Sequence, residues 1–146
     1  MQHEQYRNTI QASPARLWEV LWDLQSYEQW TKPFSPDSTV KTDWKKGSKA
    51  YFLGGNGNGM VAEIADVVPE KFMSIRHLGE LKDGVEDTTS EKVKAWQGAM
   101  ENYTLEKNGD ATDLIVDIDV NEEWLDFFRK AWPQALAVIK DLAEKK

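Results

Sequence analysis

The sequence contains no cysteine and only two histidines, His3 and His77. The missing cysteines exclude a disulfide scaffold, a cysteine nucleophile and a thiolate metal site. Two histidines are too few for a histidine-rich metal centre, so we expect no metal and no other cofactor. The sequence also has no HExxH motif and no serine, histidine and aspartate order typical of a nucleophilic triad, so we assign no catalytic residue.

Basic residues and long apolar runs are scarce as well. Lysine and arginine total 18 against 25 aspartate and glutamate residues, which gives a formal net charge of -7. An acidic domain repels phosphate backbones, so general binding to nucleic acid is disfavoured. No apolar run reaches the roughly 18 residues of a membrane span. The first residues lack the basic and apolar regions of a signal peptide, so we expect a cytoplasmic protein.

The composition is otherwise that of a folded domain with an unusual number of tryptophans. The 146 residues include 40% hydrophobic and 29% charged residues, within the range of one ordinary globular domain. We therefore expect a single domain over residues 1–146. Seven tryptophans in so short a chain predict either a large aromatic core or a cavity lined by aromatic rings.

Helix signals occur near both ends of the chain. A helix is expected over 14–24, because Ser13 suits the N-cap and Pro14 the first helical position. A second short helix should end near Trp30, with Ser26 opening a capping box. A long helix is expected over 121–146 with Asn121 as its cap. Its apolar stripe consists of Phe128, Trp132, Leu136 and Ile139, and Pro133 predicts a kink or restart.

Before and between these helices, turn signals separate alternating segments that are typical of strands. The expected strands cover 5–12, 38–42, 49–53, 60–67, 71–79, 96–106 and 112–120, and the polar residues 86–91 are expected to form a loop. Short connections predict an antiparallel order. The chain is therefore expected to be an α+β domain, in which a curved sheet of about seven strands wraps on the long C-terminal helix and can enclose a cavity.

The same order of elements resembles the START-like superfamily, also called SRPBCC, which includes the Bet v pollen allergens. Within it, the chain resembles bacterial relatives of the activator of the 90-kDa heat-shock-protein ATPase. The resemblance extends over nearly the whole chain and rests on Ile10 to Trp18, the Trp44 to Gly47 turn, Gly59-Met60, Pro69, His77 to Gly79, Trp96 to Tyr103 and Trp132 to Leu136. It implies a helix-grip fold with a cavity suited to an apolar small molecule. Lipid transfer, hormone binding, polyketide cyclisation and co-chaperone roles share this scaffold, so the fold does not settle the function.

The candidate ligand-binding residues are those expected on the walls of this cavity. They are Trp30, Phe34, Phe52, Met60, Ile75, His77, Trp96, Glu101, Tyr103, Phe128 and Trp132. Apolar burial would supply most of the affinity, and the polar members would orient the ligand. The alternative is that the aromatic side chains fill the space and form a solid core.

Three of these residues could carry polar contacts. His77 alternates with Met73 and Ile75, so its side chain should share their inward face. Glu101 shares a face with Tyr103, and a carboxylate on an apolar face needs a partner, which could be Tyr103 or His77. Trp96 is an odd number of residues from Glu101, so in a regular strand its side chain would lie on the outer face of the sheet. A bulge near Gly98 would turn it inward.

Three functions follow from these patterns. The first is binding of a hydrophobic small molecule, lipid-like or aromatic, in the cavity. The second is a co-chaperone-like interaction module with a chaperone partner, which would use an exposed face. The third is an enzyme of the cyclase or hydrolase type, for which only His77 with Glu101 provides a polar pair. Ligand binding, a pull-down of the chaperone, and turnover that depends on His77 distinguish the three.

Overall fold

The computed structural model describes residues 1–145, which form one sheet and a set of helices. The strands are β1 (Gln2–Ile10), β2 (Thr39–Lys41), β3 (Lys49–Leu53), β4 (Gly59–Val68), β5 (Phe72–Lys82), β6 (Val85–Asp87), β7 (Met100–Asn108) and β8 (Ala111–Val120). The helices are α1 (Pro14–Trp22), α2 (Leu24–Trp30), α3 (Glu91–Lys94) and α4 (Leu125–Glu144), and a 3-10 turn, Glu122–Trp124, precedes α4.

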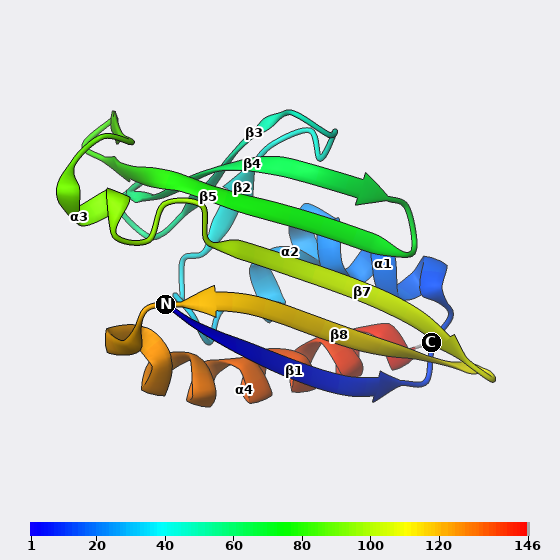
Figure 1. The fold of residues 1–146 in the computed structure, drawn as a ribbon. Helices are drawn as coiled ribbons and strands as arrows, with labels where there is room; N and C mark the ends of the chain where they lie inside the picture. The colour runs from blue at the N-terminus through cyan, green and yellow to red at the C-terminus, as the bar shows by residue number, and fades with distance from the viewer. Residues whose placement is uncertain (146) are drawn as a thin grey trace.

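The sheet is antiparallel and follows the order β1-β8-β7-β5-β4-β3-β2, with β6 paired to the end of β5. Figure 1 shows the sheet curving around the long α4, with α1 and α2 on the same side as α4. Side chains from these helices and from the inner face of the sheet make one buried cluster that includes Leu17, Ile64, Leu114 and Ile139. This arrangement confirms the predicted helix-grip fold.

The expected loop over 86–91 is confirmed only for residues 88–90, because residues 86 and 87 belong to β6 and Glu91 begins α3. Residues Val85–Asp87 form β6, which pairs with β5 across the turn at Asp83 and Gly84. Ser90 then caps the short helix α3, because its side chain accepts a hydrogen bond from the backbone N–H of Val93. Neither β6 nor α3 can be detected from the sequence, because Val93 is the one buried residue in them. Neither element therefore has a periodic pattern of apolar residues.

Of the three predicted helix caps, one is confirmed. Ser13 accepts a hydrogen bond from the N–H of Arg16 at 3.1 Å. The capping box at Ser26 is wrong, because α2 begins at Leu24 and the Ser26 hydroxyl instead donates to the carbonyl of Val20 at 2.6 Å. Asn121 precedes the 3-10 turn but makes no side-chain cap bond.

The helix α4 continues through Pro133, so the predicted restart near Trp132 does not occur. Pro133 and Arg129, four residues before it, are both exposed. Water can therefore bind the carbonyl that lost its N–H partner to the proline ring. The predicted apolar stripe is confirmed: Trp132, Leu136 and Ile139 are buried, and Phe128 packs against the core. Within residues 1–145, no helix is both long and apolar enough to span a membrane.

Candidate functional site

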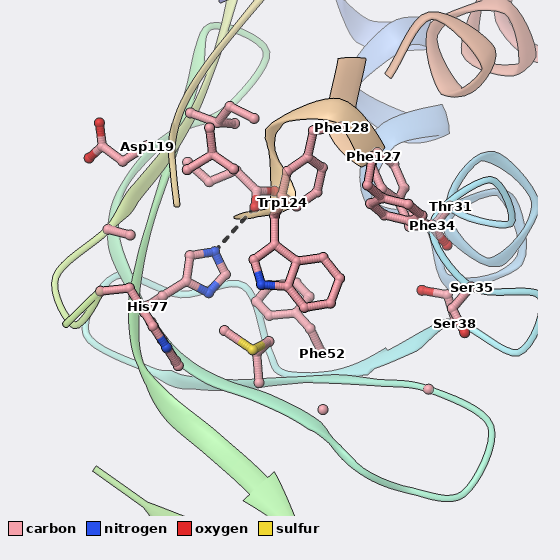
Figure 2. Close-up of a pocket in the computed structure, with 18 of the residues that line it drawn as sticks. Thr31, Phe34, Ser35, Ser38, Phe52, His77, Asp119, Trp124, Phe127 and Phe128 are labelled. Carbon is pink, nitrogen blue, oxygen red and sulfur yellow. Dashed lines mark hydrogen bonds and ion pairs between the residues drawn. The ribbon is translucent and has the colours of Figure 1, made fainter. Parts of the chain in front are cut away.

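A cavity of about 540 Å³ lies between the sheet and the helices. Its walls come from α2, the loop after it, the strands β3, β4, β5, β7 and β8, and the first half of α4. Figure 2 shows Phe34, Phe127 and Phe128 on the helical side of this space and His77 with Asp119 on the sheet side. A volume of about 300–1,000 Å³ is typical of sites that hold small organic ligands.

The structure brings ten of the eleven predicted binding residues to the cavity wall. They are Trp30, Phe34, Phe52, Met60, His77, Trp96, Glu101, Tyr103, Phe128 and Trp132. Ile75 is the exception, because it is fully buried in the core cluster rather than on the wall. It shares the inward face of β5 with His77, as expected, but lies deeper along the strand.

Trp96 reaches the cavity by a turn rather than as a strand residue. The expected strand over 96–106 is wrong at its start, because β7 begins at Met100. Gly98 has a φ of 89°, a left-handed conformation that glycine adopts without steric cost. The N–H of Gly98 donates to the carbonyl of His77 at 2.8 Å, which fixes the turn against β5. The result is that Trp96 lines the cavity despite its unfavourable parity.

Several wall residues were missed by sequence reasoning. The apolar ones include Tyr27, Met100, Ile118, Val120, Trp124 and Phe127, and polar ones include Thr31, Ser35, Ser38, Glu80 and Asp119. Helical spacing could have identified two of them, Trp124 and Phe127. Trp124 lies four residues, about one helical turn, before the predicted residue Phe128, and Phe127 lies between the two. The polar residues carry no such pattern, since tertiary folding alone brings them to the wall.

Two exposed aromatic rings stand at the N-terminal end of α4. Trp124 is 52% exposed and Phe127 is 40% exposed, although both line the cavity. Their ring centroids are 6.1 Å apart in an edge-on arrangement, and Phe127 also lies 6.4 Å from Phe34. These rings therefore form an aromatic rim where the cavity meets solvent.

A polar cluster occupies the sheet side of the cavity. The phenol of Tyr103 donates a hydrogen bond to Oε2 of Glu101. His77 Nε2 lies 3.2 Å from the other carboxylate oxygen, Oε1, and Figure 2 marks this contact with a dashed line. Pairing of β5 with β7 sets the geometry, because Glu101 lies opposite Ile75 and therefore diagonal to His77. Both partners foreseen for Glu101 are thus present.

Two buried phenols stay protonated near this cluster. Burial raises the pKa of Tyr103 well above its usual range, and the negative charge of Glu101 raises it further. Burial also raises the pKa of Tyr27, with Glu101 again the next cause. At neutral pH both side chains are therefore hydrogen-bond donors, and neither can serve as a base.

Some buried polar atoms have no hydrogen-bond partner among residues 1–145. They are His77 Nδ1, Trp22 Nε1 and Trp132 Nε1. For His77, the Nε2–H tautomer lets the ring donate to Glu101 and leaves only the unprotonated Nδ1 without a partner. The described residues contain no group of three histidine, aspartate or glutamate side chains placed to hold a metal ion. The arrangement is suited to apolar contact with orientation by one carboxylate.

The fold is similar to solved bacterial structures of low sequence identity. The Aha1 dimer from Colwellia psychrerythraea matches with a TM-score of 0.74 and 18% identity, over 99% of this chain and 97% of that one. Protein MLL2253 from Mesorhizobium loti matches with a TM-score of 0.75 and 16% identity, over 97% and 96%. CalU16 from Micromonospora echinospora matches with a TM-score of 0.68 and 16% identity, over 97% and 76%.

These identities support a shared fold and do not transfer a function. A comparison with curated protein sequences gave no match. The family model described as activator of Hsp90 ATPase homolog 1-like protein covers residues 11–144. The chain therefore belongs to the family of activator of Hsp90 ATPase homolog 1-like proteins.

Proposed function

We propose that this protein binds an apolar small molecule in the cavity between the sheet and α4. One observation carries the proposal: about 540 Å³ of space remains open although aromatic side chains line it. A solid core would have closed this space, because protein interiors are normally packed without voids of this size. Occupation by an apolar ligand would remove both the ligand and the ring faces from water, which stabilises the complex by roughly 25 cal/mol per Å².

The test is calorimetric titration with 1-dodecanol, a neutral apolar probe, together with native mass spectrometry of protein purified from its own host. Binding should raise the free energy of unfolding by about 2.7 kcal/mol at a hundredfold excess over Kd. A substitution that fills the cavity, Ala99→Phe, should abolish binding, because Ala99 is a small, buried wall residue.

The matched control is Ala137→Phe, which adds the same ring at an exposed position of α4. This variant should bind the probe as the unchanged protein does. Failure of 1-dodecanol to bind, with no small molecule retained in the native mass spectrum, would contradict the proposal. Equal binding by the Ala99→Phe variant would show that the probe lies elsewhere.

A second candidate is interaction with a chaperone, and the aromatic rim favours it. Trp124 and Phe127 expose large rings beside the cavity, and exposed aromatic clusters often mark protein contacts. The family name points to the 90-kDa heat-shock-protein ATPase as the partner to test. A pull-down and an ATPase assay with that chaperone would support this function if Trp124→Ala abolished a stimulated rate.

Catalysis would require the polar cluster to act on a bound molecule. His77 and Glu101 form an acid and base pair in contact on the cavity wall. A turnover that His77→Ala abolishes would support an enzyme of the cyclase or hydrolase type. Binding alone predicts that His77→Ala leaves the affinity for 1-dodecanol largely unchanged.

A further inference from the structure

The cavity wall carries negative charge and almost no positive charge. Three carboxylates line it, from Glu80, Glu101 and Asp119, whereas no lysine or arginine does so among residues 1–145. An apolar ligand with an acidic head would therefore meet like charge without a lysine or arginine side chain to neutralise it.

Two of the three carboxylates already have other partners. Glu80 Oε1 lies 3.4 Å from Nζ of Lys92. Asp119 Oδ2 accepts the backbone N–H of Met100 at 2.9 Å, and its Oδ1 lies 3.5 Å from Nδ1 of His3. These contacts offset part of the charge of both residues and leave Glu101 as the carboxylate to consider.

Glu101 has hydrogen-bond donors but no lysine or arginine partner in the described part of the chain. Tyr103 remains a neutral phenol, because burial raises its pKa. The Nε2–H tautomer of His77 donates its hydrogen bond without adding a positive charge to the cluster. A carboxylate can accept about four hydrogen bonds, and two are used here. The Glu101 side chain is 24% exposed, so the unused acceptor positions are accessible to a ligand in the cavity.

The surroundings of Glu101 strengthen its attraction for a cation. The rings of Phe52, Trp30 and Trp132 line the same cavity, and the negative faces of aromatic rings also attract positive charge. Partial burial lowers the effective dielectric constant, so a charge pair is stronger here than in water. By the same physics, a buried anionic head beside Glu101 would be repelled.

We propose that the cavity selects apolar amines over apolar acids, with Glu101 as the anchor for the ammonium group. This inference rests on the proposed small-molecule function and specifies its ligand class. In such a complex, the ammonium N–H groups donate to the free acceptor positions of Glu101. The hydrocarbon or ring part of the ligand then lies against the aromatic wall toward Phe34 and Phe128.

The test compares three probes of equal chain length by calorimetry at neutral pH and below their micelle concentrations: dodecylamine, 1-dodecanol and dodecanoic acid. We expect the amine to bind at least tenfold more tightly than the alcohol, and the acid to bind most weakly. Glu101→Gln should remove the preference for the amine, while the affinity for 1-dodecanol should change much less. The glutamine carbonyl oxygen can still accept from Tyr103, and its amide N–H can donate to His77 Nε2 in the other ring tautomer, so the local hydrogen bonds can persist.

The matched control is Glu106→Gln, which removes one negative charge from the same strand, at an exposed position outside the cavity. It should leave all three affinities unchanged. An equal loss of amine binding in both variants would overturn the proposal, because it would show general attraction to an acidic protein. Tight binding of dodecanoic acid to the unchanged protein would also overturn it, whether or not the Glu101→Gln variant folds. If none of the three probes binds, the proposed function itself fails.

Discussion

Tyr103 and Glu101 are joined by a hydrogen bond between two side chains on the same face of β7, with the phenol as donor. Their separation of two residues places both side chains on the inner side of the sheet. Tyr103 is 1% exposed, whereas the Glu101 side chain is 24% exposed. The phenol therefore orients the carboxylate from the core while the carboxylate remains accessible from the cavity.

Removal of this phenol should cost stability. Tyr103→Phe leaves the ring in place but takes away a buried donor, so we expect a loss of about 1–3 kcal/mol in the free energy of unfolding. Urea denaturation measures the loss. The control is Tyr51→Phe, which removes a phenol that donates to Glu86 at an exposed site and should have a much smaller effect. Equal losses in the two variants would contradict the role given to Tyr103.

The buried phenols should also make the fold sensitive to alkali. Burial raises the pKa of Tyr27 and of Tyr103, so the unfolded chain releases these protons at lower pH than the folded chain. The stability they contribute is complete below about pH 10, the ordinary tyrosine value, and is lost above it at about 1.4 kcal/mol per pH unit for each group.

This pH dependence is checked by urea denaturation at a series of pH values together with phenolate absorbance. In the folded protein, Tyr27 and Tyr103 should not ionise until the chain unfolds. Above pH 10, Tyr103→Phe should reduce the dependence of the unfolding free energy on pH by the contribution of one group, about 1.4 kcal/mol per pH unit. Two buried phenols that ionise reversibly at their ordinary pKa, with the fold intact, would refute the prediction.

The sequence predicted the fold well because its signals are local and periodic. The apolar stripe through Trp132 and Ile139 and the alternation of residues 112–120 each fix a face of one element. The cavity wall followed from those faces, so His77, Glu101 and Tyr103 could be placed together before their contacts were known. The same alternation placed Ile75 among the predicted cavity residues, because it shares a face of β5 with His77. In the structure Ile75 is fully buried in the core and does not line the cavity.

The missed features depend on contacts between distant parts of the chain. Trp96 lines the cavity because the turn at Gly98 docks on β5, and strand parity does not report such a turn. The strand β6 exists by pairing with β5, not by its own hydrophobicity. The charge balance of the wall is likewise a tertiary property, since Glu80 and Asp119 come from different strands.

Substitution of two tryptophans of the cavity wall should distinguish a role in core packing from a role in ligand binding. Trp132 is 3% exposed and its ring centroid lies 5.0 Å from that of Phe34 and 5.9 Å from that of Tyr6. Trp132→Ala should therefore cost about 3–5 kcal/mol of stability. Trp124→Ala, at the exposed rim, should change stability by less than about 0.5 kcal/mol and still weaken binding of 1-dodecanol. Calorimetry and urea denaturation on both variants check this; unchanged affinity in Trp124→Ala would remove the rim from the site.

Helix capping offers a test in which two predicted caps differ in outcome. Ser13 accepts the N–H of Arg16 at 3.1 Å, so Ser13→Ala should lower the free energy of unfolding by about 1 kcal/mol. Asn121 makes no side-chain cap bond, so Asn121→Ala should cost clearly less.

Thermal and urea denaturation of the two variants measure this difference directly. The comparison is informative because both residues are of types that sequence alone favours as N-caps. A loss at Asn121 equal to that at Ser13 would mean that its side chain caps the 3-10 turn in solution. The expected inequality instead follows from geometry, since Ser13 meets a free N–H in the first turn of α1 and the Asn121 side chain meets none.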